Sequence, residues 1–156
     1  MGTVGHEPGS RRPPIPCEVM LPVTLDTLRV TLHVLAVTVW VGGQLTLLGL
    51  LPALRAIGGD APRTVARRFN VVAWPAFGLT VVTGVWNLLA VDVGDTSPDY
   101  QATLFAKLFF VAVSGIAAFV HGRGGSKAAT AVGGAVGLLA ALAALFYGVL
   151  LGGPTA

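Results

Sequence analysis

Four long apolar stretches dominate the chain, at roughly residues 28–51, 67–91, 104–121 and 129–151. Each is about as long as the 20 helical residues that cross the hydrocarbon core of a bilayer. Hydrophobic residues make up 54% of the sequence and charged residues only 11%, whereas a soluble domain carries about 25% charge. A water-soluble fold of this size cannot hide so much apolar surface. The sequence therefore predicts an all-α integral membrane protein that rests in a lipid bilayer.

The connections between the four stretches are short, so consecutive helices should run antiparallel as neighbours. The sequence predicts a four-helix transmembrane bundle of up-down-up-down topology over residues 24–153. Residues 1–23 are rich in Pro, Gly and polar side chains, which predicts a disordered N-terminal tail. Met20, within that tail, is an alternative translation start to Met1.

The charges of the loops predict the orientation. Loop one carries Arg55, Arg63, Arg67 and Arg68, loop three carries Arg123 and Lys127, and loop two carries Asp92, Asp95 and Asp99 without Lys or Arg. The positive-inside rule places loops one and three in the cytoplasm. We therefore expect a multi-pass protein of the cell membrane with both termini outside. The net charge of +3 comes from these flanking residues and predicts no nucleic-acid partner.

One ionisable side chain, His33, lies within the first apolar stretch. A histidine at such a place is costly and is a functional-site candidate. The helical rise places His33, Asn87, Lys107 and Tyr147 about 5 to 8 Å from the outer ends of their helices. The sequence predicts a polar site there, with His33 as a metal or haem ligand. A neutral His33 bonded to a neighbouring helix, and a Lys107 that extends to the interface, are the alternatives.

Other residues are expected to support this site or to pack the helices. The predicted supporting polar layer is Lys107, Asn87, Thr83 and Tyr147, and the predicted lining residues are Trp40 and Gly43. Small residues allow close approach of membrane helices. We therefore predict packing contacts at Gly42, and at Gly133 and Gly137 in the small-residue stripe of the last helix.

Three segments resemble the CopD-like copper-resistance membrane domain. They are His33-x6-Trp40-x-Gly42-Gly43, Arg68-Phe69 with the later run Thr83-Gly84-Val85-Trp86-Asn87, and Leu104-Phe105-Ala106-Lys107-Leu108. The resemblance covers about residues 28–122. It implies copper transport or homeostasis, as a permease or accessory subunit, with a copper-binding protein as a possible partner on the outer side.

The sulfur-containing side chains that could bind copper all lie in the N-terminal tail. Cu(I) favours thioether and thiolate ligands, yet the sulfur-containing residues are Met1, Cys17 and Met20. A copper path in the bundle would then rely on His33, backbone carbonyls, the outer-loop aspartates or a partner protein.

His33 and Lys107 are also similar to a histidine and a lysine of the membrane-bound, oxygen-independent protoporphyrinogen oxidase family. That resemblance implies a b-type haem held axially by His33, with Lys107 or water as a sixth ligand. A second histidine at the same depth is lacking, which excludes a bis-histidine site. A third alternative is a structural subunit of a larger membrane complex or a homo-oligomer. The sequence assigns no catalytic residue, which favours a role other than that of an enzyme.

Overall fold

The computed structural model describes residues 23–124 and 126–153. They form four long helices, α1 (Leu25–Ile57), α2 (Ala61–Leu89), α3 (Pro98–Gly122) and α4 (Lys127–Leu151), and one 3-10 turn, η1 (Val93–Asp95). No strand occurs within these two ranges. All four long helices are long and apolar enough to cross a membrane. The predicted all-α, four-helix membrane protein is confirmed, whereas the predicted disordered tail lies, apart from Val23, outside the described residues.

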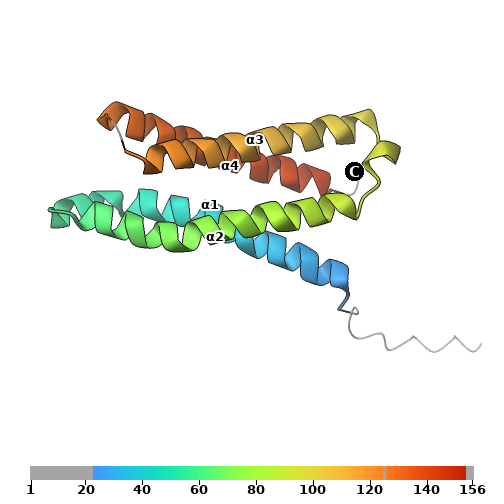
Figure 1. The fold of residues 1–156 in the computed structure, drawn as a ribbon, viewed down its shortest axis with the longest axis horizontal. Helices are drawn as coiled ribbons and strands as arrows, with labels where there is room; N and C mark the ends of the chain where they lie inside the picture. The colour runs from blue at the N-terminus through green and yellow to red at the C-terminus, as the bar shows by residue number, and fades with distance from the viewer. Residues whose placement is uncertain (1–22, 125, 154–156) are drawn as a thin grey trace, which may run out of the picture.

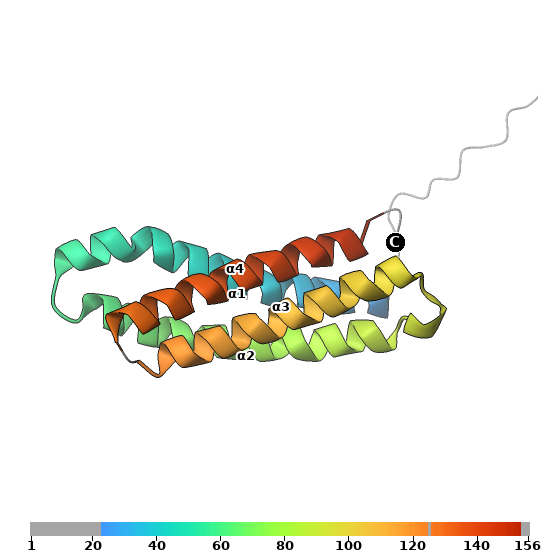
Figure 2. The same ribbon diagram turned by 90° about the horizontal axis from the view of Figure 1, so that it is seen from above.

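The helices form two antiparallel hairpins, α1 with α2 and α3 with α4 (Figure 1). The hairpins lie one above the other, and a smaller contact between α1 and α4 joins them. Seen from above, the turns α1–α2 and α3–α4 lie at one end of the bundle (Figure 2). The connection α2–α3 lies at the other end, together with the beginning of α1 and the end of α4. The Arg-containing turns and the Asp-containing connection are therefore at opposite ends.

Every helix differs by two or more residues from the predicted range at one end or both. α1 continues through Pro52 to Ile57, and α2 already begins at Ala61 with a proline in its first turn, where a missing N–H costs nothing. α3 begins at Pro98, because the Ser97 hydroxyl accepts a hydrogen bond from the Tyr100 N–H. The prediction followed apolar residues alone, but capped polar turns extend the helices beyond the apolar stretches.

The surface of the helices is as apolar as their interior. Large side chains such as Leu35, Ile116 and Leu139 are more than half exposed. A soluble protein would not leave so many of them uncovered. The central cluster of buried residues is small and comprises Trp40, Val41, Ala73 and Ala141, from α1, α2 and α4. Each helix thus buries one narrow face and presents the rest to hydrocarbon.

Glycines position the helices within each hairpin. A Cβ added to Gly43 would overlap the ring of Phe69 on α2, whereas one added to Gly42 would meet no atom within 4 Å. The close approach predicted at Gly42 therefore occurs at Gly43 instead. On α4, Gly133 and Gly137 lie against the backbone and side chains of α3, with 3.4 to 3.7 Å to a Cβ placed there. The packing role predicted for Gly133 and Gly137 agrees with these contacts.

Candidate functional site

A cavity of about 300 Å³ lies between the two hairpins and is lined by residues from all four helices. Most of its wall is apolar. The polar side chains of the wall are those of His33, Thr38, Trp40, Thr80, Lys107 and Ser114. The cavity therefore combines a few nitrogen and oxygen atoms with an extensive apolar surface, as small-molecule and cofactor sites do.

His33 is held by a hydrogen bond that assigns the proton on its ring. Its Nδ1 lies 2.8 Å from Oγ1 of Thr83 on α2. The hydroxyl proton of Thr83 is directed to the Leu79 carbonyl at 2.6 Å, so Oγ1 accepts from the Nδ1–H of His33. A neutral imidazole carries one N–H. Nε2 of His33 therefore keeps a lone pair, which is the form of histidine that ligates metals.

Lys107 reaches the same cavity from α3. Its Nζ and Cε lie beside Gly148 of α4, each 3.5 Å from where a Cβ of that residue would be. The lysine therefore packs on Gly148, at an ordinary van der Waals distance from the place where a Cβ would be. Lys107 shares the wall of this cavity with His33. Among the described residues it has neither a hydrogen bond nor an ion pair.

A buried chain of hydrogen bonds crosses the bundle beside the cavity. Nε1 of Trp40 on α1 donates to Oγ of Ser114 on α3 at 3.2 Å. Ser114 in turn donates to the Gly137 carbonyl of α4 at 3.0 Å. Ser114 is only 1% exposed. The chain connects the first hairpin to the second and fixes the indole of Trp40 in the cavity wall.

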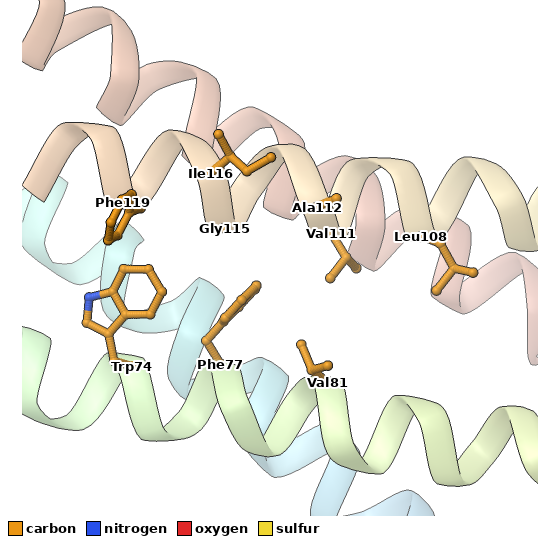
Figure 3. Close-up of a pocket in the computed structure, with 9 residues that line it drawn as sticks. All are labelled: Trp74, Phe77, Val81, Leu108, Val111, Ala112, Gly115, Ile116 and Phe119. Atoms are coloured by element: carbon orange, nitrogen blue, oxygen red, sulfur yellow. The ribbon is translucent and has the colours of Figure 1, made fainter.

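A second hollow of about 450 Å³ adjoins the cavity between α2 and α3. The two hollows share the wall residues Phe77, Val81, Leu108 and Val111. Figure 3 shows side chains from α2 and α3 facing each other across this space without filling it, with Trp74 opposite Phe119. All nine lining residues are apolar or glycine, apart from the indole nitrogen of Trp74. The polar cavity thus extends into an apolar space on the α2–α3 side.

The structure brings together part of the predicted site. His33, Lys107 and Trp40 line the cavity, and Thr83 is bonded to His33. Asn87, Tyr147 and Gly43 are not among the lining residues. Tyr147 instead stacks on Phe110, with 5.7 Å between ring centroids.

Thr80, Ser114 and Arg29 are functional candidates to which the sequence prediction gave no role. Ser114 lies on the same helical face as Lys107, seven residues on, and that spacing was the signal for it. Arg29 lies one turn before His33 on α1 and pairs with Asp26 at 3.1 Å. Its Nη1 also lies 3.5 Å from the Trp86 carbonyl of α2. Arg29 thus lies between His33 and the beginning of α1.

The donor atoms of the cavity do not complete a metal-ion site. The described residues contain no group of three or more His, Cys, Asp or Glu side chains that could hold a metal. His121 is engaged elsewhere, since its Nδ1 donates to the Thr130 carbonyl near the turn between α3 and α4. His33 thus supplies a single metal-binding nitrogen. No protein-family model, curated protein or solved structure matches this chain.

Proposed function

We propose that this membrane protein binds a b-type haem in the cavity between its hairpins, with Nε2 of His33 as the axial ligand. The observation that carries the proposal is the Nδ1–H bond from His33 to Thr83. A metal-ligating histidine typically donates its other ring N–H to a fixed acceptor, which orients the ring and sets the tautomer.

Haem suits the donor atoms better than a bare metal ion does. A bare ion needs several ligands from the protein, but the porphyrin supplies four nitrogens and leaves only axial positions. One imidazole is then sufficient, as in haem proteins with a proximal histidine. The apolar wall and the adjoining hollow between α2 and α3 offer a flat macrocycle more space than either hollow alone.

The chain's own residues would then hold and orient the cofactor. His33 ligates, Thr83 fixes the His33 ring, and Trp40, held by Ser114, forms a rigid wall. The haem, when bound, supplies one-electron exchange at its iron. The role proposed for the cavity is haem binding alone, since none of its residues is assigned to catalysis.

Copper handling is the second candidate. It rests on the resemblance of residues 28–122 to the CopD-like domain, in the order and spacing of the three segments. Copper would pass through the protein as cargo, with His33 as one of its transient ligands and a copper-binding protein outside as its partner. In that case His33 variants should change copper accumulation in cells, while the purified protein takes up no haem.

Haem titration of the purified protein in detergent tests the proposal. Wild-type protein should bind one haem with a shifted Soret band. His33→Ala should lose this shift, whereas His121→Ala should keep it, because the His121 side chain contacts the α3–α4 turn rather than the cavity. A wild-type protein that leaves the haem spectrum unchanged, or a His33→Ala variant that binds as wild type does, would overturn the proposal. A Cu(I) titration of the same three proteins measures the second candidate.

The orientation is proposed from the charges at the two ends of the bundle. We infer that the Arg-containing turns face the cytoplasm and that the connection with Asp92 and Asp95 faces outward, as the positive-inside rule requires. Single cysteines test this in a Cys17→Ser background. Asp95→Cys should react with an impermeant reagent added outside, and Ile57→Cys, exposed at the end of α1, should not. The reverse pattern contradicts the orientation.

A further inference from the structure

Lys107 lines a cavity whose wall, as far as the described residues form it, contains no carboxylate. The polar partners available in that wall are the imidazole of His33, the indole of Trp40 and hydroxyl groups. The acidic side chains of the described residues lie near the ends of the bundle. One of them, Asp26, pairs with a different cation, Arg29. A charge held in apolar surroundings is costly unless it is paired.

Arg29 shows how the chain treats a comparable cation nearby. Its side chain is 12% exposed, and the carboxylate of Asp26 lies 3.1 Å away. Lys107 has no such counter-ion in the described structure, although it lies deeper along its helix. The two basic residues therefore differ in whether the protein itself supplies the negative charge.

We propose that the ligand supplies the counter-ion of Lys107, so that this cavity selects a ligand with a carboxylate. The inference rests on the proposed haem site and names its specificity residue. The ligand class is a flat, largely apolar molecule with an acidic substituent, such as a tetrapyrrole that carries free propionates. The acid group lies beside Lys107, and the apolar body extends along the wall shared with the α2–α3 hollow.

The shape of the site supports this placement of the acid group and the apolar body of the ligand. The lysine head group packs against Gly148 of α4, and both residues line the cavity, so the ammonium group lies within the cavity wall. A charge-assisted hydrogen bond contributes more than a neutral one, especially where the local dielectric is low. A carboxylate in the ligand therefore gains an interaction that its neutral ester lacks.

Haem and haem dimethyl ester distinguish the role of Lys107 from that of His33. Wild-type protein, Lys107→Met and Lys107→Arg are titrated with each compound in the same detergent, and binding is followed by the Soret shift. The ester partitions differently into detergent, but that effect is common to all three proteins and cancels in the ratio of affinities.

The preference for the diacid over the diester should be larger in wild-type protein than in Lys107→Met by about tenfold or more, the effect of one hydrogen bond to a charged group. Lys107→Met should lose affinity for the diacid and keep the wild-type affinity for the diester, which also shows that the variant is folded. Lys107→Arg should retain the preference. The same diacid preference in wild-type protein and in Lys107→Met would overturn this inference and leave the haem site standing. Binding of neither compound would overturn the proposed function, and this inference with it.

Discussion

The α3–α4 hairpin and the junction between the hairpins are packed in different ways. Within the hairpin, Gly133 and Gly137 of α4 bring the two helix backbones into direct contact. On the α2–α3 side of the junction, bulky side chains such as Trp74, Phe77 and Phe119 leave a hollow between them. The same bundle thus contains a close-packed contact and a loosely packed one, and the ionisable residues of the cavity lie beside the loose one.

This difference separates the residues that stabilise the fold from the residues that are free to bind a ligand. Membrane helices associate through close van der Waals packing, because lipid and side chains are equally apolar. The small-residue contact of α3 with α4 satisfies that requirement. At the junction such a contact is confined to Gly115 of α3, which takes the ring of Phe77 of α2, together with the α1–α4 contact and the chain Trp40–Ser114–Gly137. We therefore expect substitutions in the hairpin to affect stability, and substitutions at the junction to affect binding.

Gly137→Leu should have the largest effect on the close-packed contact. A Cβ at this position meets Ala118 and Ala117 at ordinary contact distances of 3.5 and 3.6 Å, but the remaining three carbons of leucine have no space. Overpacking of this kind costs about 1 to 3 kcal/mol. The thermal unfolding temperature in detergent should fall clearly, whereas Gly137→Ala should be tolerated. Unchanged stability of the leucine variant would mean that this face does not meet α3.

Thr83→Val tests whether the junction serves binding. The substitution keeps the shape of the side chain but removes the acceptor for the Nδ1–H of His33. Loss of such an orienting partner typically reduces affinity by 10- to 100-fold, so haem affinity should fall by about tenfold or more. Thr38→Val is the matched control, since Thr38 lines the same cavity but donates to the Val34 carbonyl of its own helix. Equal affinities of the two variants would refute the assigned tautomer.

Ser114→Ala should have the smallest effect on stability. It tests the hydrogen bonds that connect the hairpin to the junction. It leaves the Trp40 N–H and the Gly137 carbonyl without their shared partner. Hydrogen bonds between membrane helices contribute about 0.6 to 1.7 kcal/mol, so the loss of stability should be of that size. Thr46→Ala removes a hydroxyl that bonds only to the Gly42 carbonyl of its own helix and should change less. The comparison requires the unfolding curves of both variants in one detergent.

The sequence predicted the helices and their topology because long apolar runs permit few other structures in a membrane. Helix ends were predicted less well, since caps such as Ser97 depend on single polar residues. Within the site, His33 and Lys107 were found because ionisable residues are conspicuous in apolar stretches. Tyr147 shows the limit of that reasoning. Its distance from the end of its helix placed it level with His33, but it lies on a helical face that directs its ring to Phe110.

The contact of His33 with Thr83 could not be predicted, because it depends on the rotation of α1 against α2. An error of one residue turns a side chain by about 100°, and no periodicity in the sequence determines that rotation. The contact of Lys107 with Gly148 likewise follows from how α3 and α4 pair, not from either helix alone.

The central claim is that His33 contributes one ligating nitrogen to a cavity that the rest of the bundle forms without it. Chemical rescue of His33→Gly measures this most directly, although a glycine within a helix costs about 1 kcal/mol. The variant alone should fail to shift the haem spectrum, and added imidazole should restore haem binding with the Soret band of the wild type. If imidazole restores nothing while circular dichroism shows the variant folded, or if the variant binds haem without imidazole, the account is contradicted.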